Sequence, residues 1–211
     1  MTHPADRPLP TIATETGLPT STLHDDVTGV LRNWAAPGHA QSSLREAYLG
    51  FLAARPDATW RSCKPGHVTA SAIVLSADLQ SVLLTLHPRV GSWVQLGGHC
   101  EPGDPTIAAA ALREATEESG IEGLLIDPDP VHLEVHPITC SLGIPTRHFD
   151  VRFRVIAPAG GTPKISSESL DLRFFPVNAL PTDSDEGVGT AIRLALTHPA
   201  GGNTPMWLNS L

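Results

Sequence analysis

The sequence predicts an α/β fold, in which helices cover both faces of a mixed sheet and a helical extension precedes it. Three observations lead to this prediction. Strand-like apolar runs occupy 67–75 and 81–87. A segment over 105–119 has the pattern of a four-turn helix and lies between these runs and later strand-like segments. Apolar residues also recur at helical spacing between 22 and 55, ahead of the first strand.

The composition is typical of a globular chain that can bury a core. Of the 211 residues, 41% are hydrophobic and 17% are charged. The net charge of −8 argues against a nucleic-acid polymer as partner, because binding a phosphate backbone needs a basic surface. No apolar run is long enough for a membrane helix, and the first residues lack the pattern of a secretory signal. We therefore expect no membrane partner.

The cysteine content favours a reducing compartment. The chain has three cysteines, an odd number, and no C-x-x-C pair among them. This usage is typical of the cytoplasm and gives no sign of a structural zinc site.

The composition divides the chain into three parts. Residues 1–20 are rich in proline and threonine, and we expect a disordered tail. Residues 21–62 are expected to form a helical extension of two helices with a break at 36–38, and Pro56 ends the second. The extension is expected to pack onto the main domain at 63–211, because small helical units rarely stand alone. Covering the substrate cleft and forming a homodimer contact are the alternatives.

The main domain is expected to continue with strands after its central helix. Strand patterns occur over 131–135, 149–156 and 172–175. A last helix is expected near 185–196.

The central helix and the turn before it carry the candidate chemistry. A glycine-rich turn at 97–98 precedes the helix, which is expected to have Asp104 as its N-cap and Pro105 as its first residue. Gly120 favours an end there. Three glutamates fall on one face of this helix, namely Glu114, Glu117 and Glu118. Like charges at this spacing repel, so we expect a cation between them, and carboxylate oxygens suit Mg²⁺ or Mn²⁺.

Residues 97–121 resemble the Nudix box, written G-x5-E-x7-R-E-U-x-E-E-x-G-U with U an aliphatic residue. Residues 113–121, REATEESGI, match its second half, and Gly98 matches the first glycine. Two departures stand out: Asp104 replaces the expected glutamate, and eight residues separate it from Arg113 where the box has seven. A one-residue insertion between the loop and the helix is the better alignment. It leaves the Arg-Glu-x-x-Glu-Glu constellation intact.

The resemblance implies a Nudix-like α/β/α sandwich that hydrolyses a nucleoside diphosphate linked to another group, using Mg²⁺ or Mn²⁺. The metal ligands that it implies are Glu114, Glu117 and Glu118 with the carbonyl of Gly97 or Gly98. Arg113 would orient a glutamate by a bidentate contact. Glu114 is the favoured catalytic base, and Glu168 in a distal loop is the second candidate.

Polar residues on the later strands have several interpretations. His132, Glu134 and His136 alternate with apolar residues and so share one strand face. His148 and Asp150 alternate in the same way on the next strand. They are interpreted as a second metal site, as a polar wall of the substrate pocket, or as a solvated or subunit-facing surface.

Arg89 and two further activities complete the hypotheses. Arg89 is a candidate for binding a substrate phosphate through its planar guanidinium, and an ordinary surface role is equally open. A Nudix-fold isomerase acting on an isoprenoid diphosphate is one alternative activity, which would need an acid or thiol beside the metal. A non-catalytic nucleotide-binding sensor is the other. The thiols present are Cys63, Cys100 and Cys140.

Overall fold

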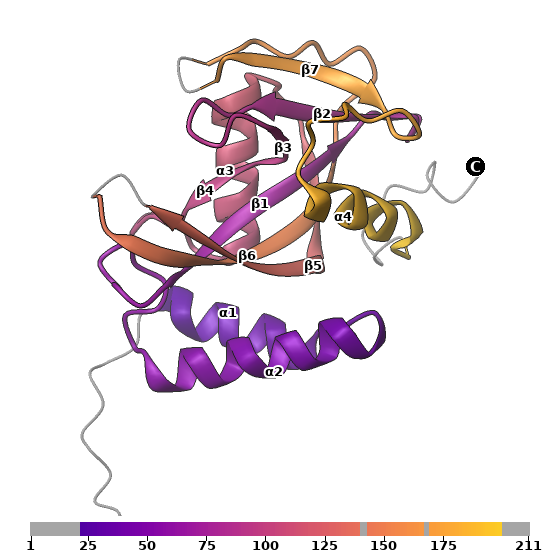
Figure 1. Cartoon of the computed structure of the whole chain (residues 1–211). Coiled ribbons are helices and arrows are strands. Elements are labelled where there is room, and N and C mark those ends of the chain that lie inside the picture. The colour runs from indigo at the N-terminus through magenta and orange to yellow at the C-terminus, as the bar shows by residue number, and fades with distance from the viewer. Residues whose placement is uncertain (1–21, 140–142, 167–168, 200–211) are drawn as a thin grey trace, which may run out of the picture.

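A computed structural model describes residues 22–139, 143–166 and 169–199 and has helices on both faces of a mixed sheet (Figure 1). In chain order the elements are α1 (Thr22–Asn33), α2 (Gly38–Ala54), β1 (His67–Leu75), β2 (Ser81–Leu86), β3 (Trp93–Val94), β4 (Leu96–His99), α3 (Ile107–Ser119), β5 (Leu125–Thr139), β6 (Pro145–Ile156), β7 (Asp171–Pro176) and α4 (Glu186–Thr197). The predicted α/β class and the N-terminal helices are confirmed. No described helix is long and apolar enough to cross a membrane.

Within the described ranges, seven strands form one sheet. Its main path is β3-β2-β1-β6-β5, while β4 pairs with β1 and β7 pairs with β2. The β1–β6 pair is parallel, and the other described pairs are antiparallel. Strand β1 therefore lies at the centre, with β2, β4 and β6 as its direct neighbours.

Strand β1 separates the core into two sides, because successive side chains point to opposite faces of a sheet. All nine of its residues are buried. Ala72 and Val74 belong to the cluster that includes Ala115 of α3, whereas Ile73 belongs to the cluster with Ile192 of α4. Helices α3 and α4 thus cover opposite faces of the sheet.

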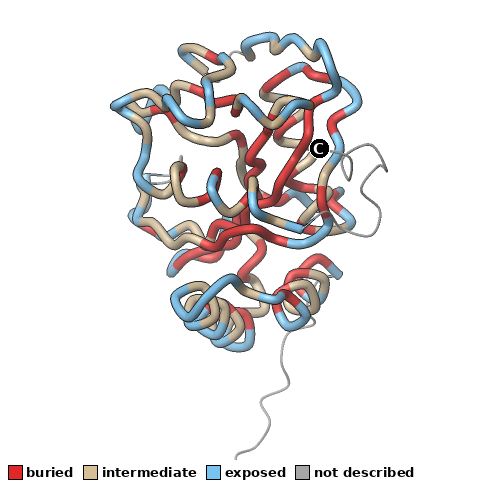
Figure 2. The backbone as a smooth tube through the Cα atoms, turned by 90° about the vertical axis from the view of Figure 1, so that its right-hand side faces the viewer, coloured by how far each residue is buried: buried red, intermediate tan, exposed pale blue. Residues whose placement is uncertain are grey.

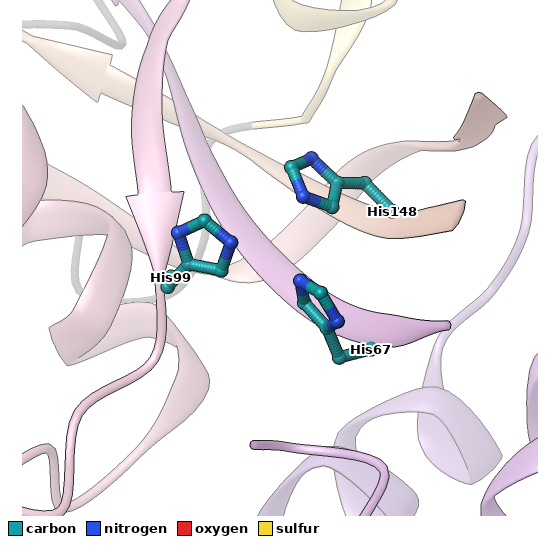
Figure 3. Close-up of side chains that lie close together, drawn as sticks. All are labelled: His67, His99 and His148. Atoms are coloured by element: carbon teal, nitrogen blue, oxygen red, sulfur yellow. The ribbon is translucent and has the colours of Figure 1, made fainter. Parts of the chain in front are cut away.

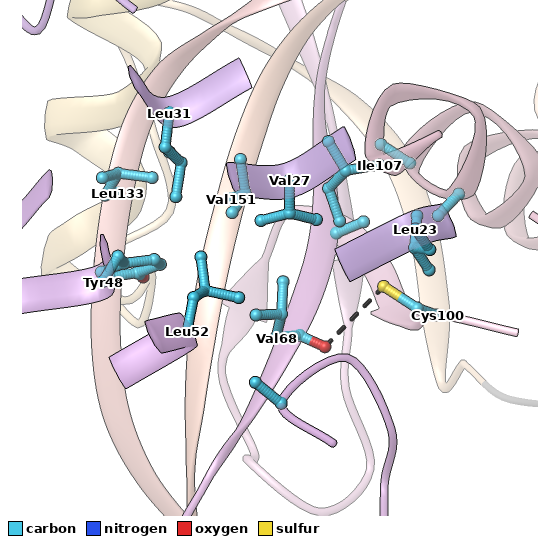
Figure 4. Close-up of a cluster of buried hydrophobic side chains, with 14 of the residues drawn as sticks. Leu23, Val27, Leu31, Tyr48, Leu52, Val68, Cys100, Ile107, Leu133 and Val151 are labelled. Atoms are coloured by element: carbon cyan, nitrogen blue, oxygen red, sulfur yellow. Dashed lines mark hydrogen bonds between the residues drawn. The ribbon is translucent and has the colours of Figure 1, made fainter. Parts of the chain in front are cut away.

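The N-terminal helices pack on the same side as α3. The cluster that joins them to the sheet includes Leu23, Val27 and Leu31 of α1, Tyr48 and Leu52 of α2, Val68 of β1, Leu133 of β5, Val151 of β6 and Ile107 of α3 (Figure 4). The outer faces of α1 and α2 are exposed, while the faces turned to the sheet are buried (Figure 2). Packing onto the main domain, the role expected for this extension, is what the structure shows.

Two side chains of α2 bond to the backbone of the sheet. The amide of Gln41 accepts from the N–H of Leu133 at 2.7 Å and donates to its carbonyl at 3.1 Å. The fully buried Tyr48 hydroxyl donates to the carbonyls of Glu134 at 2.6 Å and Asp150 at 2.9 Å. Because β5 ends the main strand path, α2 satisfies backbone groups that an edge strand would leave unpaired.

Helix α3 begins two residues later than predicted. Its N-cap is Thr106, whose hydroxyl accepts from the N–H three residues on at 3.1 Å, so the cap assigned to Asp104 is wrong. Asp26 of α1 supplies a second acceptor, because its Oδ2 receives the N–H of Ile107 at 2.8 Å. A carboxylate at this position also complements the positive end of the helix dipole. The first turn of α3 is thus held partly by α1.

Strand β5 runs well beyond the predicted 131–135. Its pairing with β6 shifts register between Ile126 and Pro130 and again between Pro130 and His132. Proline is tolerated at such irregularities and on edge strands, because it cannot donate to a regular ladder. The prolines therefore bend the strand without ending it.

Candidate active site

The carboxylate of Glu114 lies against the backbone of β4 at Gly98. A Cβ atom added at Gly98 would stand 2.6 Å from Oε1 of Glu114, well inside contact distance. The Glu114 side chain is only 14% exposed. Because Gly98 has no side chain, the carboxylate of Glu114 can lie directly against the backbone of β4.

Glu118, one turn further along α3, reaches the neighbouring glycine. Its Oε2 accepts from the N–H of Gly97 at 3.3 Å. Gly97 has φ 153°, and a Cβ there would lie 2.6 Å from the Cα of Ser71 in β1. Both carboxylates thus face Gly97 and Gly98, where the predicted glycine-rich turn is part of strand β4. Gly98 leaves room for Glu114, whereas Gly97 leaves room for the neighbouring strand β1.

Arg113 organises the acids around it. Its Nε and Nη2 donate to the two oxygens of Asp104 at 2.9 and 3.0 Å. Its Nη1 lies 3.1 Å from both Glu114 Oε1 and Glu117 Oε2, and its Nη2 also donates to the carbonyl of His99 at 3.0 Å. The bidentate partner is therefore an aspartate, and each glutamate receives a single bond.

Asp104 fits this role although it is shorter than the glutamate of the box. Burial opposes its ionisation, but hydrogen bonds from Arg113 and from the N–H of Glu101 outweigh that effect and hold its pKa below the ordinary value. The carboxylate is thus ionised and locks the guanidinium in place. The insertion ahead of α3 brings the shorter side chain within reach.

The remaining predicted site residues lie further from the turn or outside the described ranges. The Glu117 side chain is 60% exposed and lies at the outer edge of the group. Arg89 is exposed in the turn between β2 and β3. Burial is the main cause that lowers the pKa of His99, followed by Arg61 and the neighbouring histidines, and the charge of Arg89 makes a smaller contribution. Glu168 falls outside the described residues.

Beside the turn, the face of the sheet that α4 partly covers carries a buried polar network. Asp150 of β6 is only 1% exposed and accepts from Thr69 at 3.0 Å and Ser71 at 2.8 Å. It also accepts from Gln95 at 3.2 Å and from Nε of Arg152 at 2.8 Å. Four donors on one buried carboxylate stabilise its charged form, so its pKa stays low although burial opposes this.

The same network includes the residues predicted to share a strand face. In the β5–β6 register, His132, Glu134 and His136 lie opposite Arg152, Asp150 and His148 respectively. Arg152 pairs with both Glu134 and Asp150. Burial raises the pKa of Glu134, and Arg152 partly offsets the effect. The face is thus a polar, largely buried surface. Sequence analysis did not identify the Asp150–Arg152 pair as its centre.

The residues at the turn suit a hard divalent cation. Glu114 and Glu118 supply carboxylate oxygens beside the backbone of Gly97 and Gly98, whose carbonyls are oxygen ligands of the same kind. An all-oxygen set of this kind is what Mg²⁺ and Mn²⁺ prefer. The close approach that Gly98 permits is the structural observation that supports the fit.

Comparison with known proteins identifies a family domain in this chain. The family model described as NUDIX domain matches residues 65–194. Among solved structures, a NUDIX-family hydrolase from Clostridium perfringens is 22% identical over 62% of this chain and 95% of its own, with a TM-score of 0.47. MutT protein from Methanosarcina mazei Go1 is 17% identical, with 63% and 94% covered and a TM-score of 0.49. A UDP-X diphosphatase is 16% identical, with 82% and 90% covered and a TM-score of 0.45.

No curated protein matches the chain. The family model, however, spans more than half of it, from just before β1 into α4, and includes the turn and helix that carry Arg113, Glu114 and Glu118. The chain therefore belongs to the Nudix family of pyrophosphohydrolases.

Proposed function

We propose that this enzyme uses water to cleave the diphosphate linkage of a nucleoside diphosphate joined to another group, with Mg²⁺ or Mn²⁺ as cofactor. The observation that carries the proposal is the placement of two α3 carboxylates against the Gly97–Gly98 turn, with Arg113 fixed beside them. Its cysteine usage favours action in the cytoplasm.

In this proposal, Glu114 and Glu118 would hold the metal together with the Gly98 carbonyl, and Glu117 would be a further metal ligand or would hold a water at the outer edge. When bound, a divalent ion would neutralise diphosphate charge and make water more acidic. Glu114 is the proposed group that accepts or directs the proton of the attacking water, with Glu168 as the second candidate base. Arg113 acts by holding Glu114 and Asp104 in place.

Substrate binding is proposed for the side of the turn that carries Arg89 and the polar sheet face. Arg89 is exposed, and its planar guanidinium suits a contact with a substrate phosphate. The network of Asp150 and Arg152 is buried and supports this surface from below. The family and this polar surface support the proposed substrate class.

The isomerase alternative has less support. Cys100 lies within the box, but it is buried, and its Sγ points to the carbonyl of Val68 at 3.8 Å. Burial, reinforced by the charge of Asp104, raises the pKa of this thiol to about 12. A thiol of this kind is poorly placed to protonate a substrate. The sensor alternative predicts nucleotide binding without turnover.

The test is a metal-titrated hydrolysis screen over ADP-ribose, nucleotide sugars, dinucleoside polyphosphates and nucleoside triphosphates. We expect turnover of at least one class that depends on Mg²⁺ or Mn²⁺. Glu114→Gln and Glu118→Gln should abolish it, whereas Glu122→Gln, in the exposed segment after α3, should not. Wild-type rates in either of the first two variants would refute the assignment. Rearranged, unhydrolysed product would support the isomerase.

A further inference from the structure

Three histidines from three strands meet on the sheet face that carries Asp150. His67 begins β1 and pairs directly with His148 of β6, while His99 ends β4 opposite Thr69. Because Thr69 is two residues along β1 from His67, all three side chains lie on one face. Their rings point toward one another, with centroids 5.0 Å apart in each pair (Figure 3). One nitrogen from each ring lies within 4.8 Å of the others.

Two of these rings have a buried nitrogen with no hydrogen-bond partner in the part of the chain that the structure describes. The Nδ1 atom of His67 lies 3.4 Å from the carbonyl of Cys63, but its Nε2 has no hydrogen-bond partner. The buried Nε2 of His148 has none either. An unsatisfied buried polar atom destabilises a fold, so a ligand bound between the rings would account for both.

The rings are also in the protonation state that a metal requires. Burial lowers the pKa of His67 below its ordinary value. Burial, with the nearby charge of His136, lowers the pKa of His148 to about 4. Near neutral pH both are uncharged imidazoles, and each has one lone pair to offer.

Arg61 interacts with the third ring and would compete with a metal for it. Its Nη2 donates to Nδ1 of His99 at 2.8 Å. A neutral imidazole has a single lone pair, so His99 cannot accept from Arg61 and bind a cation at the same time. Arg61 is exposed, and its side chain can therefore withdraw into solvent.

We propose that His67, His99 and His148 bind one divalent transition-metal ion, with Zn²⁺ the preferred ion. Imidazole nitrogens suit zinc, and three protein ligands leave a fourth position for water or another ligand. Tetrahedral zinc with bonds of about 2.0 Å separates its ligand nitrogens by roughly 3.3 Å. Each ring would need to move by less than about 1 Å from the observed arrangement, and His99 and His148 are only partly buried.

This site is separate from the carboxylate site on the other side of β4. The Cβ direction of Gly98 points at Glu114, while the side chain of the next residue, His99, points to the opposite face. One site offers oxygens and the other offers nitrogens, so the two sites select different ions. The inference therefore stands on its own geometry and does not depend on the proposed hydrolysis.

The test uses untagged full-length protein, freed of metal with a chelator and titrated with Co²⁺ while visible absorption is recorded. We expect one equivalent to bind through nitrogen ligands and to be displaced by Zn²⁺. His99→Gln and His148→Gln should each weaken binding about 100-fold or more, since even supporting residues around a metal change affinity 10–100-fold. Arg61→Gln should tighten binding, because it removes the competitor for His99.

Two further variants serve as matched controls. His136→Gln removes a ring 5.3 Å from that of His148 but outside the trio, and it should leave the cobalt spectrum unchanged. Glu114→Gln should also leave it unchanged, because that residue belongs to the oxygen site. Circular dichroism verifies that each variant is folded.

Several results would overturn the inference. One is cobalt binding that survives both His99→Gln and His148→Gln, and another is no binding of Co²⁺ or Zn²⁺ by the wild-type protein. A third is metal-independent binding of inorganic phosphate that the same substitutions abolish, which would identify an anion site built from Arg61 and the histidines.

Discussion

Substituting Gly98 by alanine tests whether the approach of Glu114 to β4 matters for catalysis. The new Cβ would stand 2.6 Å from Glu114 Oε1, 2.7 Å from Cδ and 2.8 Å from Oε2. Ordinary contact begins near 3.4 Å, so the carboxylate must retreat by roughly 1 Å. The atoms displaced are the end of a flexible side chain, and Gly98 is not among the glycines with positive φ. The fold should therefore tolerate the change, at a cost below about 1 kcal/mol.

The catalytic effect should be far larger than the effect on stability. Misplacement of a reacting group by about 1 Å costs on the order of 100-fold in rate. We expect kcat to fall by about that factor, measured with the best substrate of the screen at saturating Mg²⁺, while urea unfolding shifts little. Gly103→Ala, in the segment between β4 and α3, is the matched control, because nothing lies within 4 Å of its Cβ position. Full activity in Gly98→Ala, or equal losses in both variants, would refute the reasoning.

Three further predictions concern residues away from the turn. Tyr48→Phe removes the buried hydroxyl that hydrogen-bonds to the carbonyls of Glu134 and Asp150 and should lower the unfolding free energy by roughly 0.5–1.5 kcal/mol, read by urea denaturation; an unchanged midpoint would contradict the role given to this hydroxyl. Burial and Arg152 lower the pKa of His132 to about 4. As pH falls from about 6.5 toward 4, the unfolded chain binds a proton at His132 while the folded protein does not, so the unfolding free energy should fall. His132→Gln should flatten that decline, and the same pH dependence of the unfolding free energy in both proteins would refute it. Cys100, with a pKa of about 12, should resist iodoacetamide at pH 8 until the protein unfolds, as followed by mass spectrometry.

The local patterns in the sequence were sufficient for much of the fold. The apolar run at 67–75 is β1, and the helix carrying the glutamates ends at Gly120 in the left-handed conformation, as predicted. Both depend on residues close together in the chain. Strands β3 and β4 were missed because both are short, and β4 has glycine at two of its four positions. Each is defined by its pairing with another strand and not by a pattern of its own.

The polar side of the site could not be predicted for a related reason. The parallel pairing of β1 with β6 joins His67 to His148, and only that register shows that these rings meet. The role of Asp104 was missed because two local signals compete. An aspartate ahead of a helix usually predicts a cap. Here the guanidinium of Arg113 donates two hydrogen bonds to Asp104, and this bidentate pair is stronger than the single bond of a cap. Thr106 then takes the cap position.

The hydrogen bond from the N–H of Ile107 to Asp26 means that the N-terminal helices help to position α3 and the glutamates that it carries. A shortened polypeptide that starts at β1 would lose that acceptor and would expose the apolar side of α3 together with Val68 and Val151 to water. In such a fragment, α3 could shift along the sheet. Weak turnover would then reflect the displaced helix and would not test the catalytic role of the glutamates.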